Sequence, residues 1–195
     1  MIITPGAALS IFVSGNDVYV AGFEAFDSSN GMLYNNTAVY WKNGKPVFLS
    51  NGLTETQANS IVVSGDDVYV AGYEYNRSSK VVKYWKNGVG INLPHENSQE
   101  TATSIAVSGN DVYVAGYSGA SNTIAKYWKN GIAVNLSDGT HDAKATSIYA
   151  SGNDVYISGY DYDIAKYWKN GIEHIISHNL RYDQSEFATS IFVTK

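Results

Sequence analysis

The most constraining feature of this sequence is a short phrase that returns at a nearly fixed interval. The phrase Ala-x-Ser-Ile begins at Ala8, Ala58, Ala102, Ala145 and Ala188, with spacings of 50, 44, 43 and 43 residues. Two further phrases recur with it: Ser-Gly-(Asn/Asp)-Asp-Val-Tyr starts at Ser14, Ser64, Ser108 and Ser151, and Tyr-Trp-Lys-Asn-Gly starts at Tyr40, Tyr84, Tyr127 and Tyr167. Such a period indicates a repeat protein, in which each copy is one supersecondary unit that needs its neighbours to bury its apolar surface.

Each copy contains four strand signals separated by turns. In the third copy we predict strands at 104–107, 111–117, 124–129 and 132–136, which we name a, b, c and d. Strands a and b are joined by Ser-Gly-Asn, and strands c and d by Asn130-Gly131, a pair that favours the positive φ angles of a type I′ hairpin turn. The composition agrees, because 13% of the residues are aromatic and only 16% are charged. One copy is therefore a four-stranded antiparallel sheet.

Strand b is apolar on both faces. Val112 and Val114 point to one side, and Tyr113 and Ala115 point to the other. An antiparallel sheet with one face in water alternates apolar and polar residues, so these sheets have to be covered on both sides. Sheets stacked radially around an axis satisfy this, whereas a solenoid needs polar capping repeats that the sequence lacks. We therefore predict a single all-β repeat domain over 1–195, a β-propeller with four blades at about 8–52, 58–96, 102–139 and 145–180.

A fifth copy of strand a is predicted at 188–193, as an extra strand of the innermost type. Its sequence, Ala-Thr-Ser-Ile-Phe-Val, nearly duplicates Ala-Leu-Ser-Ile-Phe-Val at 8–13. Either it begins a fifth blade, or it competes with the N-terminal copy for one strand position and closes a ring, within one chain or between two. Because four is the smallest usual number of blades, a homodimer that closes an eight-bladed ring is a further hypothesis.

The copies resemble the blades of bacterial β-propeller repeat proteins, which read like Ser-Gly-Asn-Asp-Val-Tyr-Val-Ala-Gly-Tyr and Ala-Lys-Tyr-Trp-Lys-Asn-Gly. The resemblance spans nearly the whole chain. It implies a propeller fold and a secreted or cell-surface location, and it transfers no catalytic residue. The first copy departs from the pattern, with Phe23 in place of tyrosine and Val39 in place of the lysine found at Lys83, Lys126 and Lys166.

Several functional classes are disfavoured by composition and motifs. A net charge of −5 repels a phosphate backbone, so we expect no nucleic-acid partner. The absence of cysteine excludes disulfides and thiolate chemistry, and no apolar run is long enough to span a membrane. His174 and His178 have metal-like spacing without a further ligand nearby, and Asp161-x-Asp163 lacks the glycine and glutamate of a calcium loop. We predict no metal, no cofactor and no catalytic residue.

The loops divide into two groups at opposite ends of each sheet. The a–b and c–d turns are tight and nearly invariant, whereas the b–c and d–a loops vary in sequence, and the b–c loops also vary in length. Varied loops on one side of a repeat array mark its binding side. The candidate ligand-binding residues there are Phe26, Tyr34, Tyr75, Arg77, His95, His141, Tyr162, His178, Arg181 and Tyr182. Aromatic rings with polar neighbours suit a sugar or a peptide, and the alternative is that these are ordinary exposed side chains.

Two sets of repeated residues have a structural interpretation. We predict that the tryptophans pack between copies, because they stand beside the same hairpin turn every time: Trp41, Trp85, Trp128 and Trp168. The lysines that follow the tryptophans and the aspartates that begin each strand b form a patterned surface. We interpret it as turn chemistry in which aspartate and asparagine bond their own backbone. The functional alternative is a ligand that itself repeats, such as a glycan or a symmetric partner.

The favoured function is a non-enzymatic binding or interaction scaffold whose ligand is a glycan, a peptide or a protein. One alternative is a structural unit of a longer or oligomeric repeat array, which the additional strand a favours. The second alternative is an enzyme acting on polysaccharide, which needs two carboxylates about 5–9 Å apart. Its candidate acids are Glu24, Glu74, Glu96 and Asp161.

Overall fold

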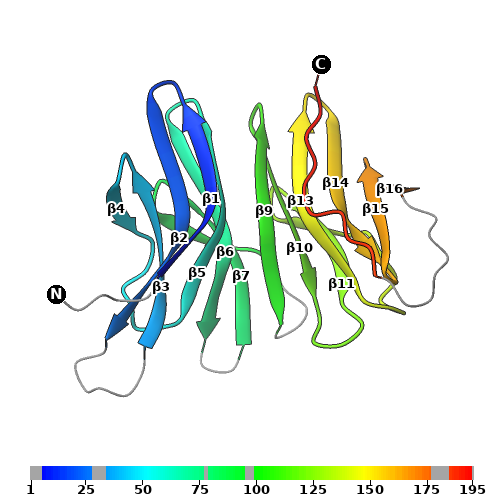
Figure 1. Ribbon diagram of the computed structural model, residues 1–195, viewed down its shortest axis with the longest axis horizontal. Helices are drawn as coiled ribbons and strands as arrows, with labels where there is room; N and C mark the ends of the chain where they lie inside the picture. Colours follow the sequence, from blue (N-terminus) through cyan, green and yellow to red (C-terminus); the bar gives the residue numbers. More distant parts are fainter. Residues whose placement is uncertain (1–5, 28–33, 77–78, 95–98, 177–184, 195) are drawn as a thin grey trace. The chain divides into compact units, whose positions relative to one another are not determined.

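The computed structural model describes residues 6–27, 34–76, 79–94, 99–176 and 185–194 (Figure 1). The described residues form sixteen β-strands and no helix, so none of them belongs to a helix capable of crossing a membrane. The strands make four separate four-stranded antiparallel sheets. The chain divides into two compact units, Met1–Leu93 and Pro94–Lys195, with two sheets each.

In both units the strands of a sheet follow one another in chain order. The first sheet contains β1 (Gly6–Ser14), β2 (Asp17–Asp27), β3 (Tyr34–Lys42) and β4 (Lys45–Phe48), and the second contains β5 (Thr56–Ser64), β6 (Asp67–Asn76), β7 (Ser79–Lys86) and β8 (Val89–Asn92). The third sheet contains β9 (Glu100–Ser108), β10 (Asp111–Ser118), β11 (Ile124–Lys129) and β12 (Ile132–Asn135), and the fourth contains β13 (Ala143–Ser151), β14 (Asp154–Asp161), β15 (Ile164–Lys169) and β16 (Ile172–Ile175).

The predicted meander is confirmed in every copy. Strands a, b, c and d of the third copy correspond to β9 to β12, and only strand a begins earlier than expected, at Glu100. The c–d turn has the expected backbone, since Asn130 and Gly131 have φ angles of 50° and 83°.

A β-bulge interrupts strand a at the variable position of Ala-x-Ser-Ile. In the third sheet Ala102 pairs with Gly116 and Ser104 pairs with Ala115, so Thr103 between them has no partner in the ladder. The backbones approach so closely there that a Cβ at residue 116 would collide with the carbonyl oxygen of Thr101. This explains why every copy has glycine at that point of strand b, while the bulge frees the x residue to reach outside its own sheet.

The sheets within each unit stack face to face. We call one face of a sheet its Val/Trp face; it carries the isoleucine of strand a, the apolar residues at the two valine positions of strand b and the tryptophan of strand c. We call the other its Tyr/Ala face. In unit 1 the Tyr/Ala face of the first sheet (Tyr19, Ala21, Ala38) packs with Leu49 against the Val/Trp face of the second (Ile61, Val68, Val70, Trp85).

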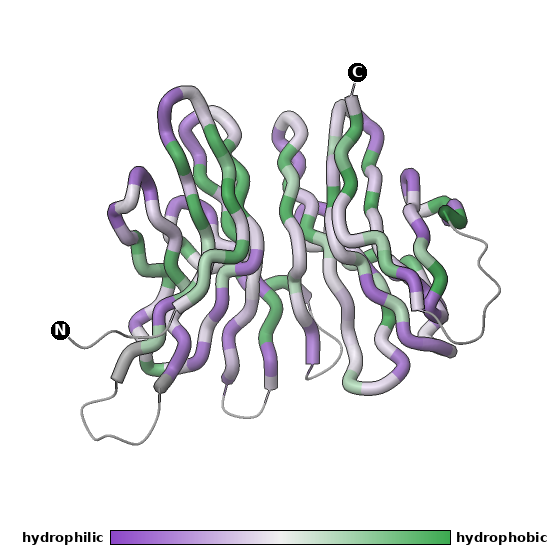
Figure 2. The backbone as a smooth tube through the Cα atoms, in the orientation of Figure 1, coloured by the Kyte–Doolittle hydropathy of each residue, from purple (hydrophilic) through white to green (hydrophobic). Residues whose placement is uncertain are grey.

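In unit 2 the same stacking joins the third and fourth sheets, and both faces of the stack are apolar as expected. The Tyr/Ala face of the third sheet contributes Tyr113, Ala115 and Ala125, and the Val/Trp face of the fourth contributes Ile148, Val155, Ile157 and Trp168. Figure 2 shows hydrophobic residues along the strands and hydrophilic residues gathered near the turns.

The C-terminal segment 185–194 differs from its prediction. It has no regular secondary structure, so the strand expected at 188–193 is not formed. The physical reason is that strand a makes its ladder with strand b of its own sheet, and the described structure gives this segment no such strand. Instead the segment runs along the fourth sheet, where the amides of Glu186 and Ala188 donate to the carbonyl oxygens of Asp163 and Gly159 at 2.9 and 3.3 Å (Figure 1).

The tryptophans have the predicted packing role, with one exception. Trp85, Trp128 and Trp168 are buried, whereas Trp41 on the first sheet is only half-buried. The difference follows from position, because the Val/Trp face of the first sheet is exposed, with Ile11 66% accessible to solvent.

This difference supplies a matched pair of substitutions. Trp168→Ala should lower the free energy of unfolding by about 3–5 kcal/mol, because it leaves a cavity between two stacked sheets. Trp41→Ala removes the same side chain from a half-exposed face and should be markedly less destabilising. Chemical denaturation of both variants measures the difference, and equal losses would contradict the stacking role of this residue.

Candidate functional site

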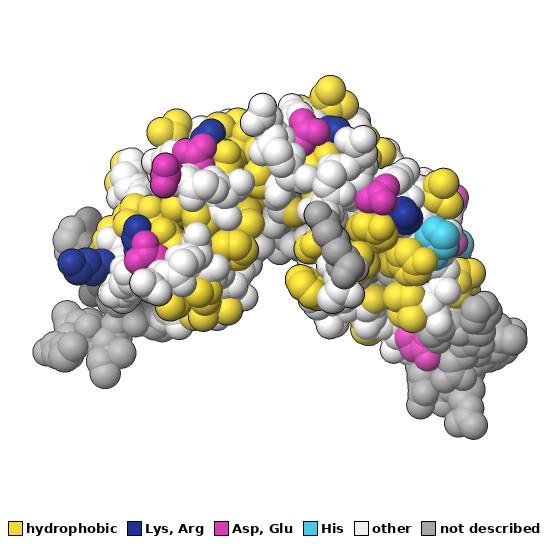
Figure 3. Space-filling model, turned by 90° about the horizontal axis from the view of Figure 1, so that it is seen from above, with side chains coloured by type: hydrophobic (Ala, Val, Ile, Leu, Met, Phe, Trp, Pro, Cys, Tyr) yellow, Lys and Arg dark blue, Asp and Glu magenta, His cyan; other side chains and the backbone are white. Residues whose placement is uncertain are grey.

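The turn end of each sheet carries an ion pair. The pairs join an aspartate of strand b to a lysine of strand c in every sheet: Lys42–Asp17 at 2.8 Å, Lys86–Asp67 at 2.7 Å, Lys129–Asp111 at 2.8 Å and Lys169–Asp154 at 3.4 Å. Figure 3 shows such acidic and basic side chains adjacent to each other on this side. In the third sheet the hydrogen bonds from Lys129 and then from Asn130 lower the pKa of Asp111.

The asparagine of the Asn-Gly turn completes each of these clusters. Asn130 donates its side-chain amide to Asp111 at 2.7 Å and accepts the Val112 amide at 2.9 Å. The expectation that the aspartates and asparagines bond their own backbone is therefore wrong, because the type I′ turn places the asparagine beside the a–b turn. Since the groups bond one another, the turn end is a repeated clamp between two hairpins.

The loop end of unit 2 contains the described candidate site. It is built from the β10–β11 loop, the β12–β13 loop and the two-residue turn between β14 and β15. In Figure 1 the β10–β11 loop lies at the opposite end of its sheet from the β9–β10 turn, as the parity of a meander requires.

Two of the predicted residues are in contact at this end. The rings of His141 and Tyr162 have centroids 4.1 Å apart and are tilted by 56°. Tyr162 is 62% exposed and His141 is also exposed, so the pair presents its surface to solvent. The amide of Tyr162 donates to the carbonyl of Asp142 at 3.1 Å, which continues the β13–β14 ladder and holds the two rings together.

The backbone at Tyr162 is unusual for a tyrosine. Tyr162 and Asp163 have φ angles of 52° and 61°, the left-handed conformation of both central residues in a type I′ turn. Asparagine and glycine are the residues that normally occupy these positions, because a larger side chain costs about 1–2 kcal/mol in this region.

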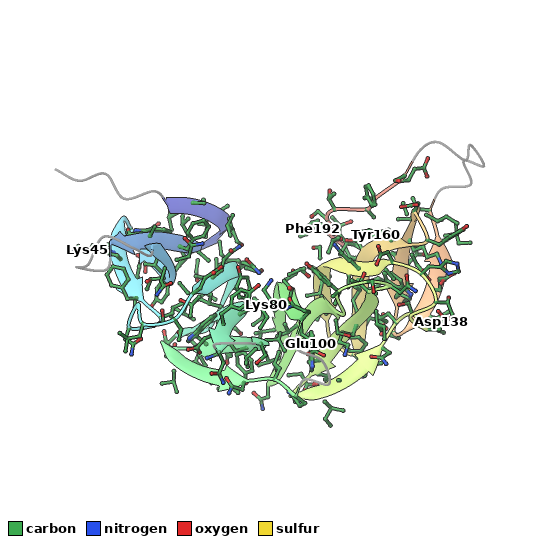
Figure 4. The ribbon with its side chains drawn as sticks, turned by 90° about the horizontal axis from the view of Figure 1, so that it is seen from below. Lys45, Lys80, Glu100, Asp138, Tyr160 and Phe192 are labelled. Carbon is green, nitrogen blue, oxygen red and sulfur yellow. The ribbon has the colours of Figure 1, made fainter. Side chains whose placement is uncertain are left out.

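A chain of hydrogen bonds fixes the imidazole of His141. Thr140 donates its backbone amide and its hydroxyl to Asp138 Oδ1 at 2.9 and 2.7 Å, and its hydroxyl oxygen lies 2.9 Å from His141 Nδ1. Because the single hydroxyl proton points to Asp138, Nδ1 of His141 has to be the donor in the second contact. The same bonds from Thr140 lower the pKa of Asp138, which is labelled in Figure 4. Nε2 of His141 is then the atom left to accept a hydrogen bond from a ligand.

A second aspartate ties two loops of this end together. Asp142 Oδ1 accepts the amide of Thr123 at 2.8 Å and lies 3.3 Å from its hydroxyl. The backbone bond from Thr123 is the main cause that lowers the pKa of Asp142. The β10–β11 and β12–β13 loops are thereby held in one arrangement, which keeps the His141–Tyr162 pair on a rigid base.

Tyr75, the third predicted residue whose side chain is described, lies at the loop end of the second sheet in unit 1. Its ring meets that of Tyr73 edge-on at 5.7 Å, and the ammonium group of Lys80 lies 3.9 Å from the Tyr73 centroid and 5.8 Å from that of Tyr75. Tyr75 is therefore half-buried in a cluster of its own sheet.

The other candidates are not placed. Phe26 and Tyr34 belong to β2 and β3, but their side chains lie outside the described structure. The remaining candidates lie outside the described residues altogether: Arg77, His95, His178, Arg181 and Tyr182. Of the two histidines considered for metal, His178 lies outside the described residues as well, and His174 stacks on Tyr167 with centroids 4.5 Å apart.

Sequence reasoning missed a set of buried lysines at the loop end. Lys126 pairs with Glu100 at 3.2 Å with both side chains fully buried, Lys83 pairs with Glu74, and Lys166 pairs with Asp161 at 3.2 Å. The available signal was a lysine inside an apolar strand, at the position where the first copy has valine. A charge there requires a carboxylate partner, which strand a or b supplies in each of these sheets, and in the fourth sheet Glu173 of strand d also pairs with Lys166 at 2.9 Å.

Comparisons with known proteins give structural likeness only. No family model matches the chain, and no curated protein matches it. Among solved structures, the chain is similar to the Bombyx mori GH32 beta-fructofuranosidase BmSUC1, with 12% sequence identity and a TM-score of 0.45. It is also similar to a single-site mutant of that protein in complex with sucrose, with 13% identity and a TM-score of 0.43. In both cases the match covers 96% of this chain and 50% of the other, so the chain spans about half of that protein's length.

The hydrogen-bond chain at His141 predicts its tautomer. In the neutral imidazole the proton should reside on Nδ1, because Thr140 has already committed its own proton to Asp138. Nitrogen NMR of the histidine rings measures this directly. Thr140→Val should shift His141 toward the Nε2 tautomer, and a wild-type ring already protonated on Nε2 would contradict the assigned geometry.

Proposed function

We propose that the chain is a non-enzymatic binding scaffold of the β-propeller type, which holds a sugar or peptide ligand on the loop end of its sheets. The single observation that carries this proposal is Tyr162, an exposed aromatic ring in a strained turn, in contact with an oriented imidazole. A strained residue that gains little burial is accounted for when a ligand supplies the missing contact.

The chemistry of the pair fits a ligand with both an apolar face and hydroxyl or amide groups. The Tyr162 ring offers a rigid surface whose ordering loses little entropy, and Nε2 of His141 accepts a hydrogen bond at its edge. A sugar ring has both properties, and so does a peptide with a polar side chain. We rank the sugar first, because its hydroxyl groups would donate to the imidazole while its carbon face covers the phenol ring.

The propeller arrangement is supported by the stacking within each unit. Within each unit the Tyr/Ala face of one sheet packs against the Val/Trp face of the next, and a residue at or beside the bulge makes a hydrogen bond across the stack. In unit 2 the hydroxyl of Thr103 donates to Ala145 O at 2.8 Å. Sheets that stack in this repeated way are the kind of blade from which a propeller is built.

The geometry favours binding over catalysis. In the chain Asp138–Thr140–His141 the hydroxyl lies between the carboxylate and the imidazole, so His141 donates to Thr140 and does not activate it as a base would.

Of the carboxylates considered for sugar cleavage, Glu96 lies outside the described residues, and Glu74 and Asp161 each pair with a lysine. Burial raises the pKa of Glu74, but hydrogen bonds from Lys83 and Thr54 outweigh it and hold that pKa below its usual value. A glycosidase acid needs the opposite shift.

Substitution of Tyr162 tests the proposal. We expect a glycan array, followed by calorimetric titration with the strongest sugar, to show binding by the wild-type chain that Tyr162→Asn weakens at least tenfold. Because asparagine suits the left-handed turn, the free energy of unfolding of the same variant should equal that of the wild type or exceed it by about 0.5–1 kcal/mol.

Ile172→Asn is the matched control, since Ile172 is 67% exposed but lies at the turn end, and it should leave binding unchanged. A peptide array with the same three proteins examines the second ligand class. If neither array shows binding, or if Tyr162→Asn binds as tightly as the wild type, the proposed function is wrong.

A further inference from the structure

The first sheet has an exposed face that matches a buried face elsewhere in the chain. Ile11 is 66% exposed, whereas its counterparts Ile61 and Ile148, each against the preceding sheet of its unit, are 4% and 6% exposed. Val18, Val20 and Trp41 line a pocket of about 580 Å³ on this same face. The residues are those of an internal stacking interface, and what is missing is the Tyr/Ala face that covers them in the other stacks.

The fourth sheet carries that Tyr/Ala face. On the first sheet, the face that packs on the second sheet contains Phe12, Tyr19, Tyr40 and Ala21. The fourth sheet has Tyr149, Tyr156, Tyr167 and Ser158 at the same four positions. The chain therefore carries both halves of one more stacking interface, one half on the first sheet and the other on the fourth.

The C-terminal segment 185–194 already lies on the fourth sheet, in the position that a next strand a would take. Thr146 donates its hydroxyl to Ala188 O at 2.5 Å, just as Thr103 donates to Ala145 O at 2.8 Å between the third and fourth sheets. The amide of Glu186 donates to Asp163 O as the amide of Ala143 donates to Thr123 O, both at 2.9 Å.

Two aromatic contacts complete the cover. Phe192 meets the Tyr149 ring at 5.5 Å between centroids and Phe187 meets the Tyr160 ring at 4.6 Å, and Figure 4 shows Tyr160 and Phe192 on this side of the fourth sheet. Both phenylalanines remain exposed on their other sides. The segment covers part of the Tyr/Ala face without supplying the rest of a sheet.

We propose that the first sheet of a second chain stacks on the fourth sheet and displaces the segment 185–194, which acts as a removable cover of that interface. The segment and β1 require the same position on the fourth sheet. β1 brings an ordered ladder with β2 and the whole Val/Trp face behind it, whereas the segment brings one irregular stretch of chain. Stacking therefore buries far more apolar surface than the cover does. Head-to-tail contacts of this kind are heterologous and close a ring when two chains make them reciprocally.

Opposite effects of two variants test the proposal in sedimentation velocity over a concentration series of the full chain. Ile11→Glu places a charge in the stacking face and should weaken association at least tenfold. Ile172→Glu, at an equally exposed residue whose counterpart Ile132 stays 71% exposed on the stacked third sheet, should associate like the wild type. The double variant Phe187→Ser and Phe192→Ser loosens the cover and should strengthen association at least tenfold.

Each outcome of this experiment either supports or excludes the proposal. Association that is reduced by Ile11→Glu alone and increased by the phenylalanine variant supports the proposal, including the case in which the wild type is monomeric and only the phenylalanine variant associates. If wild type and phenylalanine variant are both monomeric, the second chain is excluded. If the phenylalanine variant associates more weakly than the wild type, the segment belongs to the interface and the displacement is wrong.

Disulfide trapping identifies the partner face. Ser104 Oγ lies 3.2 Å from the amide of Ile148 and Ser10 Oγ lies 3.3 Å from that of Ile61, so Ser147 of one chain should lie beside Ile11 of the second. The chain has no cysteine of its own. A mixture of size-tagged Ser147→Cys and Ile11→Cys chains should form a mixed disulfide. The mixture of Ser147→Cys with Ile172→Cys should not, and equal yields from the two mixtures would overturn the proposed contact.

Discussion

Stacking of a Tyr/Ala face on a Val/Trp face is the interaction on which the rest of this structure depends. None of the four described sheets has a polar face, so none is stable in water without a neighbour, and the gain comes from apolar area removed from water on both sides at once. The two faces are complementary in size as well as polarity. Ala21 and Ala38 contribute small, fully buried side chains to the same core as Trp85. Their small size leaves room for the indole ring between the two sheets.

Apolar burial is not directional, so the register of the stack needs another source. A few hydrogen bonds supply it: in unit 1 the hydroxyl of Ser10 accepts the Ile61 amide, and in unit 2 that of Thr103 donates to Ala145 O. Both residues stand at or beside the bulge of strand a, which turns a side chain out of its own ladder. The glycine of strand b is therefore required for the stack as well as for its own sheet, because the bulge forms only where the backbone of strand b lacks a Cβ.

The sequence predicted what depends on local pattern. Alternation gave the strands and their two faces, and Asn-Gly gave the hairpin turns, because both effects act between residues close in the chain. The clamp of Asp111, Lys129 and Asn130 and the burial of Lys126 against Glu100 were not predictable in the same way. Those contacts join residues from different strands whose side-chain directions follow from the turn geometry and the bulge.

The candidate site shows the same division. Meander parity placed His141 and Tyr162 at one end, and this was correct, but it could not show that they touch. Their contact follows from the way the β13–β14 ladder continues beyond its last pair into the turn. The left-handed backbone of Tyr162 also had no signal in the sequence, since a tyrosine between two aspartates gives none of the usual indications of a type I′ turn.

The proposed binding site and the proposed stacking interface use different surfaces of the same sheets. The loop residues lie at strand ends, whereas the stacking faces lie along the strands, so a second chain added to a stack leaves the loop ends open. Each added chain would then bring one more His141–Tyr162 pair, held on the same rigid base. For a ligand with repeated sugars, such a set raises the overall affinity through effective concentration even when each single contact is weak. The two proposals are therefore physically consistent, because stacking of chains would multiply an exposed site that has only a small contact area for a ligand.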